Sequence, residues 1–151
     1  MQSASQSSHT SLRVGQVITV LVALFLLFDG VIHVLNISAV VDGSRRLGFP
    51  VDSAVWIGVV ELVCLALYLI PRTSVLGAIL LTGYLGGAVA AQVRIEAPVF
   101  STLLFPVYTG VLLWVGLYLR DADLRELVPL RRASRSLPAA AGSSAERTAA
   151  R

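Results

Sequence analysis

The chain has 151 residues, of which 56% are hydrophobic and only 14% are charged, and its mean hydropathy is +0.79. A composition this apolar excludes an ordinary water-soluble domain and indicates a chain that lies in a membrane. The formal net charge is +3, but aromatic residues are not interleaved with the basic ones, so we expect no nucleic-acid partner.

Four long apolar segments follow one another along the chain. They cover Val17 to Val41, Ala54 to Ile70, Leu76 to Val93 and Val99 to Leu119. At about 1.5 Å rise per residue, a helix over each segment can cross a hydrocarbon core of about 30 Å, the second and third only just. The first segment is longer than the core of a signal peptide, about 7 to 15 residues, so we expect it to be retained. We therefore predict an all-α membrane protein, a four-transmembrane-helix bundle that lies in the lipid bilayer.

The segments outside the spans differ from the bundle in composition. Residues 1–16 are rich in Ser, Gln and Thr, which predicts a flexible N-terminal tail. Residues 17–125 form the predicted membrane domain, with connections broken by Gly and Pro. Residues 126–151 are rich in Arg, Ala and Ser, which predicts a disordered cytoplasmic tail.

The arginines set the expected orientation, because loops rich in basic residues stay in the cytoplasm. Four spans would place most of the arginines near the bundle on the side of the two termini: Arg13, Arg72, Arg120, Arg125, Arg131, Arg132 and Arg135. The opposite side would hold only Arg45, Arg46 and Arg94. We therefore expect a multi-pass protein of the cytoplasmic membrane with both termini cytoplasmic.

Two of the spans carry a carboxylate near their midpoints, Asp29 in the first and Glu61 in the second. An ionised carboxylate at the centre of a bilayer costs about 2.5 to 3.5 kcal/mol, so such a residue usually faces a partner or a cavity. Asp29, His33 and Asn36 are spaced i, i+4 and i+7, which predicts one polar stripe on the first helix.

Antiparallel threading puts one polar residue of each span near the centre of the membrane. These residues are Asp29, Glu61, Tyr84 and Tyr108. Roughly two helical turns toward the outside lie Asn36, Gln92 and Thr102. The cytoplasmic halves of the spans are almost purely aliphatic. The pattern predicts a polar pocket that is closed on the cytoplasmic side and approached from the outside.

This polar layer has three interpretations. Its side chains could simply hydrogen-bond one another and hold the helices in register. They could line a pocket for a quinone or another lipid-soluble ligand. They could also belong to a proton or ion pathway, because carboxyl groups inside a membrane can relay protons.

Metal and thiol chemistry have little support in the sequence. Asp29, His33 and Glu61 could in principle form a site with two carboxylates and one histidine. No second histidine lies in any span, so we predict no metal site. The single cysteine, Cys64, is predicted to be a small buried hydrophobe. We expect no catalytic residues and no established cofactor; an enzymatic role would be that of one part of a quinone-linked oxidoreductase.

The third span carries small residues at every fourth position, Gly83, Gly87 and Ala91. Such a ridge lets another helix approach closely. The ridge could pack within the bundle, or it could form a face for a partner membrane protein or a second copy of the chain.

Several strings resemble the DoxX-like family of small bacterial membrane proteins. They are 47–50 (LGFP), Glu61 in the second span, 70–73 (IPRT), 77–88 (GAILLTGYLGGA) and 114–121 (WVGLYLRD). The resemblance covers about residues 17–125 and implies four transmembrane helices in the bacterial plasma membrane. It also implies that Glu61 occupies the position of the family's characteristic acidic residue.

The family is named after a subunit of an archaeal thiosulfate:quinone oxidoreductase, and most of its members have no assigned activity. This chain has no second cysteine and no cofactor motif, so sulfur chemistry has no direct support. The sequence favours a non-catalytic accessory or partner-binding component of the membrane. The alternative is a quinone- or lipid-binding subunit of a membrane redox system.

Overall fold

The computed structural model describes residues 3–50 and 52–127, and every regular element within these ranges is helical. The elements are α1 (Ser3–Val34), α2 (Ser38–Arg46), α3 (Ser53–Leu69), α4 (Ser74–Arg94), the π-helical turn η1 (Val99–Leu103), α5 (Phe105–Arg120) and α6 (Ala122–Leu127). The predicted all-α class is therefore confirmed. The predicted C-terminal tail lies outside the described residues from residue 128 onward.

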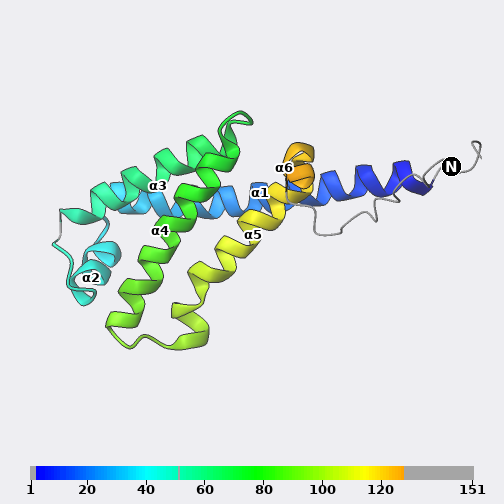
Figure 1. Cartoon of the computed structure of the whole chain (residues 1–151). Helices are drawn as coiled ribbons and strands as arrows, with labels where there is room; N and C mark the ends of the chain where they lie inside the picture. Colours follow the sequence, from blue (N-terminus) through cyan, green and yellow to red (C-terminus); the bar gives the residue numbers. More distant parts are fainter. Residues whose placement is uncertain (1–2, 51, 128–151) are drawn as a thin grey trace, which may run out of the picture.

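Four of these helices form the bundle. Helix α1 packs against α3 and α5, and α4 packs against the same two helices (Figure 1). The N-terminal part of α1 extends past the other helices, and the short α2 lies at the opposite end of the molecule (Figure 1). We call this opposite end the α2 end, and the end where α5 passes into α6 the α6 end.

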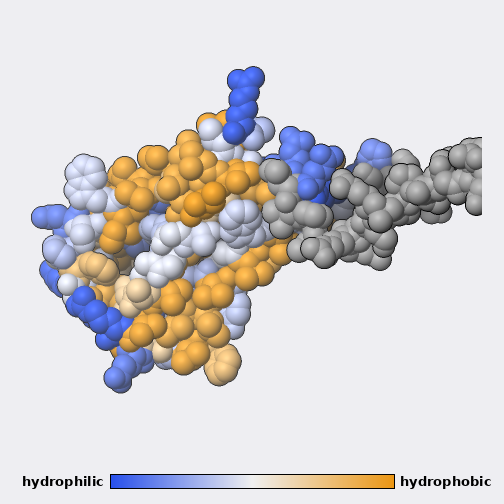
Figure 2. Space-filling model, in the orientation of Figure 1, coloured by the Kyte–Doolittle hydropathy of each residue, from blue (hydrophilic) through white to orange (hydrophobic). Residues whose placement is uncertain are grey.

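Three helical segments are long and apolar enough to cross a membrane: His9–Val34, Ser74–Arg94 and Val99–Arg120. Only 28% of the most apolar window in each of them is buried inside the protein, so most of their hydrophobic side chains face outward. Figure 2 shows the result as hydrophobic surface over the middle of the molecule, with hydrophilic residues toward its ends. The fourth bundle helix, α3, is also apolar but has only 17 residues.

The first predicted span differs most from the structure. Helix α1 begins at Ser3, inside the segment expected to be a flexible tail, and it ends at Val34 rather than Val41. The end is a Schellman turn, in which the N–H of Asn36 donates to the carbonyl of His33 and the N–H of Ile37 to that of Ile32. Asn36 has φ +50°, a left-handed conformation that Asn adopts more readily than most residues. The chain then turns into α2.

The α6 end of the bundle is tightly packed. The Tyr68 side chain is completely buried, and its hydroxyl donates to the carbonyl of Leu113 at 3.0 Å. A Cβ atom on Gly77 would collide with the backbone of Tyr68, so this glycine lets α3 and α4 meet. Cys64 belongs to the apolar core beside these residues, as its sequence position suggested.

Candidate functional site

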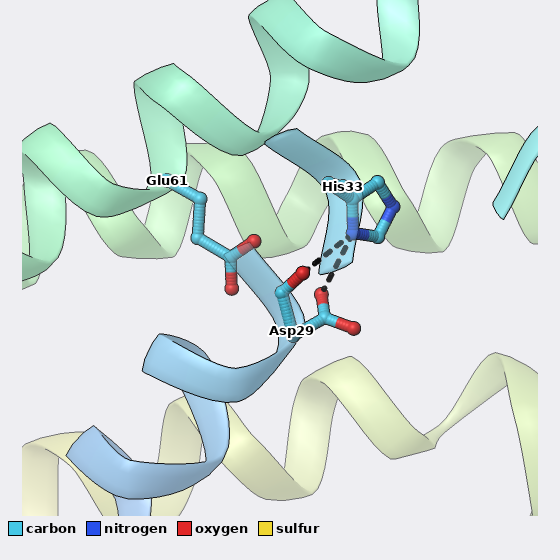
Figure 3. Close-up of side chains that lie close together, drawn as sticks. All are labelled: Asp29, His33 and Glu61. Carbon is cyan, nitrogen blue, oxygen red and sulfur yellow. Dashed lines mark hydrogen bonds and ion pairs between the residues drawn. The ribbon is translucent and has the colours of Figure 1, made fainter. Parts of the chain in front are cut away.

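Three residues that the sequence analysis singled out meet between α1 and α3. Asp29 and His33 come from α1, and Glu61 comes from α3. Each can offer one oxygen or nitrogen atom such that the three atoms lie within 4.8 Å of one another. Figure 3 shows the Glu61 carboxyl group pointing toward the Asp29 and His33 side chains. We call these three residues the acidic cluster.

Within the cluster, helical spacing joins Asp29 and His33. The imidazole Nδ1 of His33 lies 2.9 Å from the backbone carbonyl oxygen of Asp29 and 3.7 Å from its carboxylate Oδ2 (Figure 3). Both side chains are partly exposed. A side chain at i+4 lies one turn above its partner on the same helical face, so the sequence spacing alone produces this pair.

Glu61 has a different environment, because its side chain is completely buried. The hydroxyl of Tyr84 on α4 donates a hydrogen bond of 2.9 Å to Glu61 Oε2. The other carboxylate oxygen, Oε1, has no hydrogen-bond partner among the described residues. Buried carboxylate oxygens are normally hydrogen-bonded, so an unpaired one needs a physical explanation.

Two glycines bring α1 and α3 together beside the cluster. A Cβ atom on Gly58 would lie 2.7 Å from the carbonyl oxygen of Gly30 and 2.7 Å from the Cβ of His33. A Cβ on Gly30 would lie 2.7 Å from the Leu62 side chain. At Gly58 the obstructing atoms are backbone atoms and the Cβ of His33, so only glycine allows this crossing, whereas a side chain at Gly30 would displace Leu62. The backbone therefore brings Glu61 within reach of the α1 pair.

A cavity of about 510 Å³ opens from the acidic cluster toward the α2 end. It is lined by residues of α1, α3, α4 and the segment that connects α1 with α3: Asp29, His33, Ser44, Leu47, Phe49, Ile57, Gly83, Tyr84, Gly87, Ala88, Ala91 and Gln92. Its volume is within the range of about 300 to 1,000 Å³ that is usual for small-molecule sites.

The small-residue ridge of α4 forms one wall of this cavity. A Cβ atom on Gly83 or Gly87 would meet nothing within 4 Å, and Ala91 lines the same space. No helix in the described part of the chain packs against these two glycines. Packing within the bundle, one of the two interpretations of the ridge, therefore does not apply to Gly83 and Gly87.

Four residues of the predicted polar pocket do not line the cavity: Glu61, which is buried, Tyr108, Asn36 and Thr102. Tyr108 does not line the cavity, and 48% of its surface is exposed. The buried face of α5 is set by Thr109, Leu113 and Gly116, and the position before Thr109 points about 100° away from that face. Asn36 is outside the predicted stripe because α1 ends before it; its Oδ1 is buried without a partner.

Other lining residues were missed by the sequence analysis. Ser44, Leu47 and Phe49 reach the cavity from α2 and the loop after it. The early end of α1 sends the chain back over the cavity, and an apolar pattern that continues to Val41 hides this turn. The signal that could have revealed it is Asn36, because Asn is common at the left-handed position after a helix.

Comparison with known proteins agrees with the architecture. The model of the DoxX-like family matches residues 17–116, which include all three residues of the acidic cluster and Tyr84. No curated protein and no solved structure matches the chain.

Proposed function

The chain belongs to the DoxX-like family and is an integral membrane protein, and we propose that its cavity binds a lipid-soluble ligand with a hydroxyl-bearing head, of the quinol class. The observation that carries this proposal is the composition of the cavity wall. Polar groups gather at the acidic cluster, and Leu47, Phe49 and Ile57 supply apolar surface elsewhere. A ligand with a polar head and an apolar body matches this division.

The hydrogen-bonding groups favour a donor on the ligand. Carboxylate oxygens accept hydrogen bonds, and Asp29 presents a partly exposed carboxylate to the cavity. The Tyr84 hydroxyl already donates to Glu61 Oε2, so it is not free to donate to a ligand carbonyl. The hydroxyl group of a quinol in the cavity can donate to the Asp29 carboxylate, which lines the cavity, whereas a quinone offers only acceptors. The reduced form should therefore bind more tightly.

The glycine wall supports entry of the ligand from the membrane. Gly83 and Gly87 are both exposed, and no side chain covers them. A molecule dissolved in the bilayer can therefore approach the cavity along α4. The same opening supports the second candidate function, an accessory component in which a helix of a partner protein packs onto the ridge.

The proposed topology has four spans, with both termini in the cytoplasm and the α2 end outside. Helix α3 is about 26 Å long at 1.5 Å per residue and packs between α1 and α4, which supports its crossing with them. The distribution of arginines supports the orientation. Cysteines placed at Arg46 and Arg72 in a Cys64→Ser chain test it with a membrane-impermeant maleimide. Labelling from outside at residue 72 but not at residue 46 would contradict it.

The function is tested by native mass spectrometry of the full chain and by binding of a short-chain ubiquinol. We expect the wild-type protein to bind the ubiquinol, and Gly83→Leu to lose this binding because the new side chain enters the cavity. Gly86→Leu is the matched control. Gly86 is also exposed with open space around it, but it faces the groove between α4 and α5 instead.

The outcomes separate the two candidate functions. Loss of ubiquinol binding in Gly83→Leu, with retention in Gly86→Leu, supports the ligand site. A co-purifying protein that disappears only in Gly83→Leu, with no ubiquinol bound by any chain, supports the accessory role. Equal ubiquinol binding by both variants contradicts a ligand site at this cavity.

A further inference from the structure

We propose that Asp29, His33 and Glu61 form a binding site for one divalent transition-metal ion, with Zn²⁺ as the closest chemical match. The absence of a second histidine counted against this site in the sequence. The geometry points the other way, because a helix pair joined through glycines brings two carboxylates and an imidazole to one place. Carboxylate and imidazole groups are both ligands for Zn²⁺ and other transition metals.

The spacing of the donor atoms fits a metal ion. Zn²⁺ lies about 2.0 to 2.2 Å from oxygen and nitrogen ligands, so two ligands of a tetrahedral ion are about 3.4 Å apart. Asp29 Oδ2 and His33 Nδ1 are 3.7 Å apart. Nδ1 lies 2.9 Å from the backbone carbonyl oxygen of Asp29, so metal binding at Nδ1 replaces that hydrogen bond and releases the Nδ1 proton. All three donors lie within 4.8 Å of one another, so closure around an ion needs a movement of up to about 1.4 Å, which rotation of the carboxyl groups can supply.

The negative charge of the two carboxylates also favours a bound cation. Two carboxylates lie close together, and within the described residues no arginine forms an ion pair with either one. Within the described ranges, His33 is the one basic group in an ion pair with either of them. A divalent ion would neutralise both carboxylates, which removes the cost of placing like charges together away from water.

The oxygen without a partner supplies an independent observation. Glu61 is completely buried, its Oε1 makes no hydrogen bond, and its carboxyl group points toward Asp29 and His33 (Figure 3). The Tyr84 hydroxyl donates to the other oxygen, and such hydrogen bonds hold metal-ligating carboxylates in a fixed orientation. Three protein ligands leave at least one coordination position, as in zinc sites that also bind a small molecule.

The test measures metal binding by the full chain, purified in detergent without a histidine tag. We expect one Zn²⁺ per chain by elemental mass spectrometry and visible d–d absorption with Co²⁺. Mg²⁺ prefers an octahedron of oxygens and should not compete. Glu61→Gln and His33→Gln should each weaken Zn²⁺ binding by more than about 100-fold, and Tyr84→Phe by about 10-fold.

His9→Gln and Glu96→Gln are the matched controls, because both residues are exposed and neither belongs to the cluster. Both should bind Zn²⁺ like the wild type. The proposal is overturned if the wild type binds no more Zn²⁺ than His33→Gln, or if His9→Gln removes the binding.

A second measurement needs no change in the cluster. In the His9→Gln chain, His33 is the only histidine. Zn²⁺ should protect it from modification by diethylpyrocarbonate. Equal modification with and without Zn²⁺ overturns the site, and this result is the one expected if the two carboxyl groups share a proton and bind no metal. Gly83→Leu should abolish ubiquinol binding and keep Zn²⁺ binding, so the metal site and the proposed function fail separately.

Discussion

Helix α4 contains two kinds of glycine, and they distinguish the two ends of the bundle. At the α6 end, Gly77 lies against the backbone of Tyr68 with no room for a Cβ atom. Toward the α2 end, Gly83 and Gly87 have open space where a side chain would be. The same residue type therefore serves close packing at one end and leaves a cavity at the other.

The polar groups differ in the same way. At the α6 end, the Tyr68 hydroxyl donates to Leu113 and lies 3.5 Å from the Thr19 hydroxyl. At the α2 end, Asn36 Oδ1 and Glu61 Oε1 are buried without a hydrogen-bond partner in the described part of the chain, although Arg120 Nε at the α6 end is a third such atom. Tight packing and paired hydroxyls indicate a stabilising core, whereas open space beside unpaired oxygens indicates a binding site.

The largest expected effect is at Gly77. We expect Gly77→Ala to lower the free energy of unfolding by about 3 kcal/mol, because α3 and α4 must separate to admit the methyl group. Thermal unfolding in detergent measures this change. A Gly77→Ala protein as stable as the Gly83→Ala protein would abolish the distinction between the two ends.

The next effect concerns the buried tyrosine. Tyr68→Phe removes a hydroxyl with two polar neighbours, and we expect the free energy of unfolding to fall by about 1 kcal/mol. Tyr108→Phe is the control, because Tyr108 is half exposed. If both variants unfold at the wild-type temperature, the Tyr68 hydrogen bond contributes nothing to the core.

At the α2 end, we expect a substitution to raise the free energy of unfolding instead of lowering it. Glu61→Leu replaces a buried carboxyl group that has an unpaired oxygen with an apolar side chain of similar size, so we expect stability to rise by about 1 kcal/mol. Zn²⁺ binding should be lost. The result that would remove Glu61 from the binding site is unchanged binding by a folded Glu61→Leu protein.

The smallest expected change in stability is at Gly83 and Gly87, the two glycines with open space around them. Gly83→Ala and Gly87→Ala place a methyl group in free space, and alanine favours a helix over glycine by about 0.5 to 1 kcal/mol. We therefore expect each variant to unfold slightly above the wild-type temperature. Destabilisation would show that the ridge packs against something in the purified protein, and a dimer seen by size-exclusion chromatography would identify a second copy.

The sequence was sufficient for much of this architecture. Hydropathy located the bundle helices to within a few residues at most ends, and the i, i+4 spacing placed Asp29 beside His33. The convergence of Glu61 and Tyr84 followed from matching depths in antiparallel helices. These predictions depend only on helix geometry, which the sequence determines locally.

Other features needed the folded chain. The sequence placed Tyr108 at the right depth but could not give the rotation of α5, which depends on packing of its buried face. It identified the ridge at Gly83 and Gly87 but could not distinguish a packed face from a cavity wall. It also extended α1 past Asn36, because the apolar residues of α1 and α2 read as one run.

The Schellman turn at Asn36 places the acidic cluster near one end of α1, which in the proposed topology sets its depth below the membrane surface. A helix from Val17 to Val41 would have placed Asp29 at its midpoint. With α1 ending at Val34, the carboxylate is only about 8 Å from the end of the helix at 1.5 Å per residue. The cost of a charge falls from the bilayer centre toward the interface, so one left-handed asparagine brings Asp29 to a depth that ions and water reach at lower cost.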